Sequence, residues 1–233
     1  MADKKVVFLF DVDNTLLLHD QVTADLRKHL ETTVGPEHSK RYWEFFEQIR
    51  NELGYADYLG ALQRYRLEYP RDPHLLAPSF FLLSYPFANR LFPGSIDAVR
   101  HVQKFGTAVV LSDGDVVFQP RKISRAGLYE VFNGNVLIYV HKEKELDDVE
   151  TRYPAEHYVM FDDKLRILDA MKKIWSNKLT TVFVRQGHYA HDAKAVAGFP
   201  PADITIESIG NTLDFTLKDL LEAGQTRAST SAV

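Results

Sequence analysis

The stretch that decides the fold is Val6–Thr15, which reads VVFLFDVDNT. Five apolar residues, Val6–Phe10, follow one another without a break, and two carboxylates, Asp11 and Asp13, come after them. A short apolar run of this kind, rich in β-branched and aromatic residues, is typical of a strand buried on both faces in the middle of a parallel sheet. We therefore expect a buried strand near the N-terminus that ends at two acidic side chains.

The two carboxylates point to a bound cation. If the strand continues past Asp11, its period of two makes Asp11 and Asp13 point the same way. Two such anions repel each other and lose solvation, and a hard cation such as Mg²⁺ offsets both effects. The alternative is that Asp13-Asn14-Thr15 only forms a turn and a helix cap. This stretch alone does not separate the two interpretations.

The composition is that of an ordinary globular protein. The chain has 233 residues, 45% hydrophobic and 26% charged, with a formal net charge of −4. This length suits one large domain or a core domain with an insertion, and the charge gives no basic surface for nucleic acid. The absence of cysteine excludes disulfides and thiol catalysis, and no apolar run approaches the ~20 residues of a membrane span. We expect a cytoplasmic protein without nucleic-acid or membrane partners, and the sequence predicts no oligomeric state.

The segment after the first strand, residues 23–91, is helical in pattern. Apolar and aromatic residues recur at helical spacing, and prolines punctuate the second half of the segment. We interpret it as an inserted all-helical cap; the alternative is that its helices pack on a face of the sheet. The expected helices span 25–32, 39–53 and 57–69.

From residue 93 onward, apolar strand patterns alternate with helical ones, which predicts a doubly wound parallel α/β sheet. We assign residues 1–15 and 93–225 to the core, 16–92 to the cap and 226–233 to a mobile tail. The expected strands after the first span 107–111, 135–140, 157–161, 180–184 and 204–206, and the expected helices span 95–104, 120–126, 143–152, 167–175 and 213–223.

Polar side chains suited to phosphoryl transfer lie at the ends of these strands. They are Ser112, Lys142 and the Asp162-Asp163 pair, in addition to Asp11. In an open parallel sheet the carboxyl ends of the strands meet at one edge, where ligands bind. Carboxylates bind Mg²⁺ and can attack phosphorus, a second acid can move a proton, and hydroxyl and ammonium groups can neutralise phosphoryl oxygens.

Four segments, in order along the chain, resemble the motifs of the haloacid dehalogenase-like (HAD) superfamily. Asp11–Thr15 resembles motif I (DxDxT), Leu111-Ser112 resembles motif II, Lys142 resembles motif III and Phe161–Asp163 resembles motif IV. The helical insertion after motif I resembles the C1-type cap of that superfamily. The resemblance implies a Rossmann-like core and Mg²⁺ as the cofactor.

The resemblance also implies a role for each motif residue. Asp11 would be the nucleophile and a Mg²⁺ ligand, and Asp13 would be the general acid/base, with its backbone carbonyl on the metal. Ser112 would hold a phosphoryl oxygen, helped by the backbone N–H of Asp113. Lys142 would neutralise the charge between Asp11 and the phosphate.

Several positions leave alternatives open. For the motif IV metal ligand, Asp163 is the first choice and Asp162 is the alternative. The motif III lysine is followed by Glu instead of the usual Pro, and Lys144 is a rival for its place. Asp113 and Asp115 add acids near the phosphate site, where they would turn away, join the metal shell or select a cationic or amine-bearing substrate.

The implied activity is a Mg²⁺-dependent phosphatase (a phosphomonoester hydrolase) that acts through an aspartyl-phosphate intermediate on a small phosphorylated metabolite. The alternatives are a phosphomutase or 2-haloacid dehalogenase on the same scaffold, or a non-catalytic phosphate-binding regulatory module. Outside the motifs, we expect His19 and Asp20 to be linker residues or substrate contacts at the start of the cap. We expect a solvated helix start at Gln119, Arg121 and Lys122, with substrate binding as the alternative. We expect the core of the cap to contain the aromatic residues Tyr42, Trp43, Phe45 and Phe46, with a place for one or two of them in a substrate pocket as the alternative.

Overall fold

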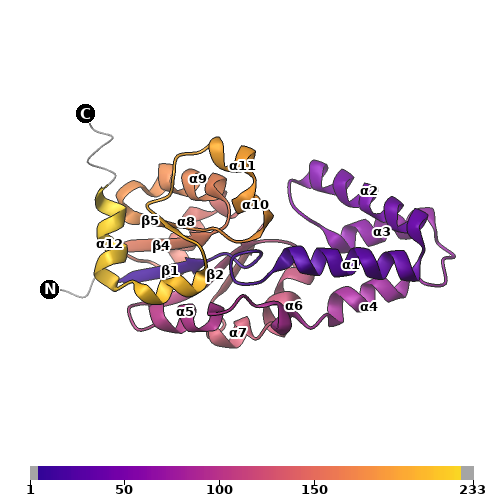
Figure 1. Ribbon diagram of the computed structural model, residues 1–233, viewed down its shortest axis with the longest axis horizontal. Helices are drawn as coiled ribbons and strands as arrows, with labels where there is room; N and C mark the ends of the chain where they lie inside the picture. The colour runs from indigo at the N-terminus through magenta and orange to yellow at the C-terminus, as the bar shows by residue number, and fades with distance from the viewer. Residues whose placement is uncertain (1–4, 227–233) are drawn as a thin grey trace.

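The computed structural model describes residues 5–226 and contains a six-stranded sheet in which all strands are parallel (Figure 1). The strand order is β3-β2-β1-β4-β5-β6. This is the order of a doubly wound α/β fold, so the predicted fold class is confirmed. The strands are β1 (Val6–Phe10), β2 (Thr107–Asp113), β3 (Val136–Tyr139), β4 (His157–Asp162), β5 (Leu179–Val184) and β6 (Ile204–Ile206).

The first strand lies in the middle of the sheet. Phe8 of β1 pairs with Ala108 of β2 on one side and with Val159 of β4 on the other. The chain moves outward from β1 through β2 to β3 and then crosses to β4 on the opposite side of β1. The strand order therefore reverses between β1 and β4, and the carboxyl ends of these two strands border the crevice where doubly wound folds bind ligands.

The sheet is buried on both faces. Phe8 and Phe10 of β1 lie in one hydrophobic core, and Val7 and Leu9 lie in the other. Because successive strand residues point to opposite faces, burial of both faces explains the unbroken apolar run. The first core includes residues of α5 (Ser95–Val102) and α12 (Leu217–Thr226), and the second includes residues of α8 (Leu146–Arg152) and α9 (Leu165–Trp175).

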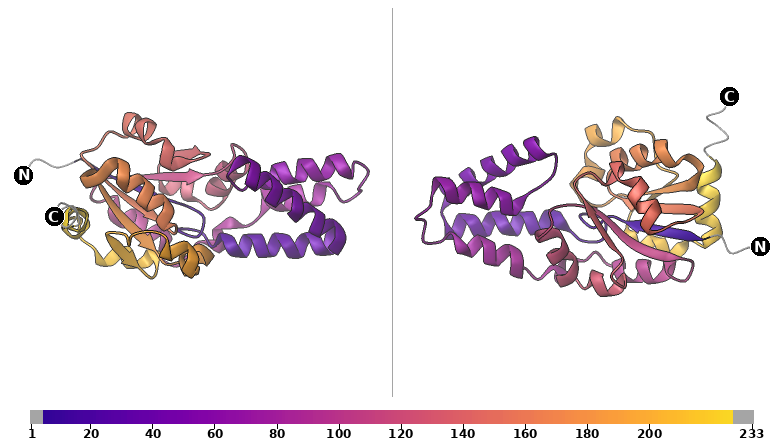
Figure 2. Two further views of the ribbon diagram at one scale, coloured as in Figure 1. Left: turned by 90° about the horizontal axis from the view of Figure 1, so that it is seen from above. Right: turned by 180° about the vertical axis from the view of Figure 1, so that it is seen from behind.

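Four helices between β1 and α5 form a bundle that extends away from the sheet, at the end of the molecule opposite α12 (Figures 1 and 2). We call this bundle the helical unit. Its centre is aromatic, with Tyr42, Phe46 and Tyr58 buried. The limits 16–92 assigned to a cap domain stay a prediction. The helices are α1 (His19–Thr33), α2 (Pro36–Leu53), α3 (Tyr58–Glu68) and α4 (Leu76–Ser84).

The chain enters and leaves the helical unit through two adjacent segments. The N–H of Leu18 donates to the carbonyl oxygen of Arg90 at 2.7 Å. The N–H of Phe92 donates to the carbonyl oxygen of Leu16 at 3.0 Å. The two crossings between the core and the helical unit are therefore tied to each other by backbone hydrogen bonds.

Several observed helices begin or end at other residues than predicted, and some were not predicted, α4 among them. The helix α1 begins at His19 rather than at residue 25, because its buried face already starts at Val22. The helix α4 was not predicted because Pro78 was interpreted as a helix stop; here it lies in the first turn, where no intrahelical N–H is needed. The segment expected to begin a helix at Glu143 forms a 3₁₀ turn first, and α8 begins at Leu146.

The remaining elements are short. Thr226 is the last residue of α12, and the rest of the predicted tail lies outside the described residues. Within residues 5–226, none of the helices has both the length and the apolar character needed to cross a membrane. These elements are α6 (Phe118–Arg125), α7 (Leu128–Val131), α10 (Gly187–His191), α11 (Ala193–Ala197) and the 3₁₀ turns η1 (Phe87–Arg90), η2 (Lys142–Lys144), η3 (Ser176–Lys178) and η4 (Ile209–Asp214).

Candidate active site

Three buried carboxylates meet where β1 and β4 end. Asp11 follows β1, Asp162 is the last residue of β4, and Asp163 follows it. One carboxylate oxygen from each lies within 4.8 Å of the others. The N–H of Asp11 donates to the carbonyl oxygen of Phe161 at 3.0 Å, which ties the end of β1 to β4. The topological switch point thus carries the acidic cluster that the sequence predicts.

A buried lysine lies against this cluster. The Nζ of Lys142 is 2.5 Å from Oδ1 of Asp11 and 2.7 Å from Oδ2 of Asp162. Burial alone would lower the pKa of Lys142, but the carboxylates of Asp11 and Asp162 raise that pKa above its usual value, so the side chain is an ammonium. Lys144 is exposed, so the structure brings Lys142 and not its rival to the cluster.

Among the described residues, the Asp163 carboxylate has no hydrogen-bond or ion-pair partner, unlike Asp11 and Asp162. Both of its oxygens are buried and lack a hydrogen-bond partner among the described residues. Burial raises the pKa of Asp163 above its usual value, although Lys164 opposes the shift. Burial also raises the pKa of Asp162, to about 6, against the attraction of Lys142. Buried carboxylate oxygens that accept no hydrogen bond are suitable ligands for a hard cation. Asp11, Asp162 and Asp163 therefore fit Mg²⁺, and among the described residues no hydrogen bond competes for the two oxygens of Asp163.

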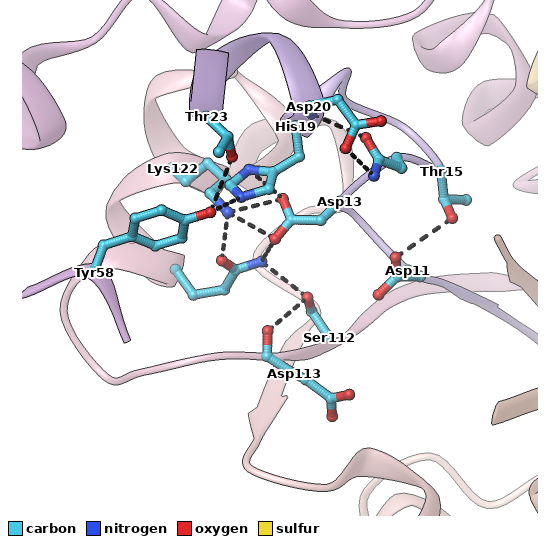
Figure 3. A network of polar contacts seen from close by, with 12 residues as sticks. Asp11, Asp13, Thr15, His19, Asp20, Thr23, Tyr58, Ser112, Asp113 and Lys122 are labelled. Atoms are coloured by element: carbon cyan, nitrogen blue, oxygen red, sulfur yellow. Dashed lines mark hydrogen bonds and ion pairs between the residues drawn. The ribbon is translucent and has the colours of Figure 1, made fainter. Parts of the chain in front are cut away.

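The carboxylate of Asp13 does not join that cluster. It faces Lys122 of α6 instead, whose Nζ lies 2.8 and 2.7 Å from its two oxygens (Figure 3). Because β1 ends at Phe10, the strand period no longer aligns Asp11 with Asp13. The part of Asp13 in metal binding through its backbone carbonyl stays a prediction.

Lys122 and Gln119 are buried, with exposed fractions of 1% and 2%, so the expectation of a solvated helix start is wrong. Gln119 Nε2 donates to Ser112 Oγ at 2.9 Å, and Lys122 Nζ donates to Gln119 Oε1 at 2.8 Å. The two side chains therefore connect the motif II hydroxyl to Asp13. A sequence signal existed: Phe118 and Lys122 are four residues apart and share the inward face of α6.

On its other side, Asp13 faces a histidine of the helical unit. His19 Nδ1 lies 3.4 Å from Asp13 Oδ1, and His19 Nε2 lies 2.8 Å from the hydroxyl oxygen of Tyr58. Burial lowers the pKa of His19 to about 4 despite the attraction of Asp13, so the ring is neutral at pH 7. Burial would raise the pKa of Asp13, but the neighbouring His19 and Lys122 lower it to about 2. Asp13 is therefore ionised at pH 7.

The two extra acids after motif II bind backbone groups. Asp113 Oδ1 accepts the N–H of Lys142 at 2.7 Å, which anchors the segment that carries the buried lysine. Asp115 Oδ1 accepts the N–H groups of Val117 and Phe118 at 2.8 and 2.7 Å, at the start of α6. Of the three roles left open, the structure favours carboxylates committed to the local backbone rather than to an amine-bearing substrate.

A cleft of about 830 Å³ separates the core from the helical unit. Asp13, Lys122 and Lys164 line it from the core. The Nζ of Lys164 lies 5.0 Å from the ring centroid of Tyr189 and forms no ion pair with the described residues. No role was predicted for Lys164, although it directly follows motif IV.

The helical unit contributes an aromatic wall to this cleft. Trp43, Phe46 and Tyr58 line it, whereas Tyr42 and Phe45 pack away from it. Tyr42, Trp43, Phe45 and Phe46 are all buried in the hydrophobic core, as expected, and two of them also line the cleft. Asp20, at the start of α1, accepts hydrogen bonds from Asn14 Nδ2 at 2.9 Å and from the N–H of His188 at 2.8 Å, and so joins α1 to α10.

Comparisons with known proteins give relatives among solved structures. No protein-family model matches the chain, and no curated protein matches it. The chain is 61% identical to a haloacid dehalogenase-like hydrolase from Burkholderia xenovorans LB400; the match covers 91% of this chain and 99% of that one, with a TM-score of 0.88.

More distant structures share the fold. The HAD-hydrolase YfnB from Bacillus subtilis bound to magnesium is 16% identical to this chain, with a TM-score of 0.60. The match covers 91% of this chain and 100% of YfnB. The L-2-haloacid dehalogenase from Xanthobacter autotrophicus with chloropropionic acid covalently bound is 16% identical over 89% of this chain and 96% of its own, with a TM-score of 0.58. The near-complete match at 61% identity decides the family. The chain belongs to the haloacid dehalogenase-like hydrolases.

Proposed function

We propose that this protein is a Mg²⁺-dependent phosphomonoester hydrolase that acts through an aspartyl-phosphate on Asp11, with a small phosphorylated metabolite as its substrate. The observation that carries the proposal is the Asp163 carboxylate, buried beside Asp11 with no hydrogen-bond partner among the described residues. Three buried carboxylates repel a phosphate ester unless additional positive charge is present. A Mg²⁺ ion held by Asp11 and Asp163 would supply positive charge to the phosphoryl oxygens.

The reaction has two displacement steps at phosphorus. In the first, a carboxylate oxygen of Asp11 attacks, the bond from phosphorus to the ester oxygen breaks, and its electron pair stays on the leaving oxygen. That oxygen takes a proton from Asp13 and departs as the alcohol. In the second, the Asp13 carboxylate takes a proton from a water molecule, the water oxygen attacks phosphorus, and Asp11 is released together with inorganic phosphate.

Lys142 and Lys164 have different roles in stabilising negative charge. Lys142, in contact with Asp11, places a positive charge beside the nucleophile. Lys164 forms no ion pair with the described part of the chain and lines the cleft, so its ammonium is available to the phosphoryl oxygens. The Ser112 hydroxyl, held by Gln119, is the third donor that we assign to the phosphoryl group.

Asp13 has to take up a proton before it can act as the acid. The pKa of Asp13 is lowered to about 2, so the free enzyme holds this carboxylate ionised at pH 7. A phosphate monoester has a second pKa of about 6 and therefore binds partly as the protonated monoanion. Its negative charge opposes the ionisation of Asp13. Binding of the substrate anion therefore raises the pKa of Asp13 and favours the protonated form that acts as the acid.

Other chemistry on the same scaffold is less well supported. A 2-haloacid dehalogenase needs a nucleophilic carboxylate but neither a metal nor a second acid. It would have no use for the unpartnered Asp163 or for the buried Lys122 that holds Asp13. A phosphomutase would use the same residues, so its product, an isomerised sugar phosphate, separates it from a hydrolase.

The test is phosphate release from a panel of phosphorylated metabolites, with and without Mg²⁺, for the wild type and Asp11→Asn. We expect Mg²⁺-dependent release by the wild type and a loss of at least about 10³-fold in the variant, because the nucleophile is gone. Halide release from 2-chloropropionate is measured in parallel. Halide release without phosphate release, or full activity of Asp11→Asn, would reject the proposal.

A further inference from the structure

A chain of polar contacts runs from the helical unit to the predicted general acid/base. The Thr23 Oγ1 lies 3.0 Å from the Tyr58 hydroxyl oxygen, and that oxygen lies 2.8 Å from His19 Nε2. On the other side of the same imidazole, Nδ1 lies 3.4 Å from Oδ1 of Asp13 (Figure 3). Three side chains of the helical unit thus end at one carboxylate of the core.

The middle member of this chain is rigidly placed. Tyr58 is the first residue of α3, and Asp57 Oδ1 caps that helix by accepting the N–H of Gly60 at 2.6 Å. The Tyr58 ring is 5% exposed, and its centroid lies 4.6 Å from that of Phe46 and 5.4 Å from that of Phe118. Phe118 belongs to α6, the same helix that carries Lys122. The hydroxyl of Tyr58 is therefore held at a defined distance from the core site.

The order of the protons along the chain follows from the Asp13 charge. Tyr58 has one hydroxyl proton, and a neutral imidazole has one N–H. If Tyr58 donates to His19 Nε2, the imidazole proton lies on Nδ1 and faces the Asp13 carboxylate. If Tyr58 donates to Thr23 instead, the Nδ1 lone pair faces that anion and is repelled. The first arrangement is favoured, and it gives three donors that all point toward Asp13.

The last contact of the chain is incomplete. The Nδ1 of His19 is buried and has no hydrogen-bond partner among the described residues, because 3.4 Å to Asp13 exceeds the range of a normal N–H···O bond. Catalytic hydrogen bonds are often long without substrate and shorten in the reactive complex. A small approach of α1 to the core would complete this one.

We propose that His19 and Tyr58 are positioning residues for Asp13, so that the helical unit sets the orientation of the acid/base from one side while Lys122 holds it from the other. The proposal rests on the hydrolase function proposed above. It gives the helical unit a part in proton transfer, in addition to covering the cleft. Neither His19 nor Tyr58 needs to touch the reacting atoms.

The test compares two substrates whose leaving groups differ in basicity. A sugar or alkyl phosphate needs a proton on its leaving oxygen, whereas p-nitrophenyl phosphate leaves as a stable anion. For Tyr58→Phe we expect the single-turnover rate of leaving-group release to fall about 10-fold on the alkyl phosphate and less than about 3-fold on p-nitrophenyl phosphate, with substrate affinity unchanged, because this rate reports only the first displacement, in which Asp13 acts as the acid. For His19→Ala we expect a fall of about 100-fold and the same selectivity.

Conservative variants and a matched control separate positioning from structure. His19→Asn places an amide N–H near the position of Nδ1, and we expect it to recover part of the activity lost in His19→Ala. Thr23→Val removes the outermost hydroxyl while keeping the shape, and we expect a smaller loss with the same selectivity. Tyr65→Phe is the control, since the Tyr65 hydroxyl in the same helix donates to Asp72, outside the cleft; it should match the wild type on both substrates.

Equal losses of this single-turnover rate on the two substrates would overturn the proposal, because they would reflect a structural or binding role, and so would an unchanged rate in both Tyr58→Phe and His19→Ala. Failure of the proposed function is read elsewhere. If the proposed function is wrong, the wild type releases no phosphate from either substrate. If only the present inference is wrong, the wild type is active and the variants lack the expected difference between the two substrates.

Discussion

The lysine inside the carboxylate cluster gives a prediction about stability that is independent of any substrate. Replacing Lys142 by Met keeps most of the buried stem and removes the ammonium. That ammonium is 2.5 Å from Asp11 and 2.7 Å from Asp162, whose side chains are 5% and 0% exposed. Without it, two buried carboxylates lose their cation while Asp163 already lacks a partner among the described residues.

The size of the effect follows from the burial. Removing one partner of a buried ion pair costs about 3–5 kcal/mol, because the remaining charge is left uncompensated. A chain of this length has a urea m-value near the upper end of the usual range, about 3 kcal/mol/M, so the unfolding midpoint of Lys142→Met should fall by roughly 1–2 M in metal-free buffer. Mg²⁺ at about 100 times its Kd should restore about 3 kcal/mol.

The assay is urea unfolding followed by circular dichroism, with EDTA and with Mg²⁺. Lys172→Met is the matched control, since Lys172 Nζ lies 2.8 Å from Asp203, whose side chain is fully buried and lies outside the carboxylate cluster. It should lose stability, and at a fixed Mg²⁺ concentration it should be stabilised only as much as the wild type, whereas Lys142→Met should be stabilised more because its uncompensated carboxylates bind the cation more tightly. The reasoning is refuted if Lys142→Met unfolds at the wild-type midpoint in EDTA, or if Mg²⁺ stabilises both variants equally.

Three further predictions concern the surroundings of the site. Asp113→Ala should lower kcat/KM about 10-fold, because it removes the acceptor of the Lys142 N–H, and Asp113→Asn should lower it less. Full activity of Asp113→Ala would contradict the anchoring role. Burial lowers the pKa of His19 from 6.5 in the unfolded chain to about 4 in the folded protein. As the pH falls from 6.5 to 4, the unfolded chain therefore binds a proton that the folded protein does not, and the free energy of unfolding should decrease by about 3 kcal/mol. A His19→Gln variant should show a flatter urea midpoint over that pH range, and an unchanged slope would count against the shift. Gly187→Ala should cost more than about 1 kcal/mol in a thermal melt, because φ is +69° and a Cβ would meet Asn14; an unaltered Tm would show that the backbone adapts.

The features that depend on neighbours in the sequence were predictable. The apolar run Val6–Phe10 indicates a strand buried on both faces, and β1 lies at the middle of the sheet. The positions of Ser112 and Asp163 follow from finding where each strand ends. Because parallel strands deliver their carboxyl ends to one edge, local patterns were enough to assemble the acidic cluster in advance.

The features that depend on how distant helices pack were not predictable. Lys122 and Asp13 are 109 residues apart, and His19 and Tyr58 are 39 apart. A lysine near a helix start is usually solvated, and nothing local shows that α6 turns this one inward. For the same reason Asp13 was expected to share a cation with Asp11, whereas the end of β1 at Phe10 lets the two carboxylates face different partners.

The paired crossings between the core and the helical unit have an evolutionary consequence. Since Leu18 bonds to Arg90 and Phe92 bonds to Leu16, the ends of the inserted segment lie side by side. An insertion whose ends are adjacent adds little loop-closure entropy and leaves the strand order untouched. The inserted segment can therefore be replaced or remodelled in evolution, with a change of substrate, while the acidic centre stays the same. The contact of His19 with Asp13 is the point where such an exchange would also reach the chemistry.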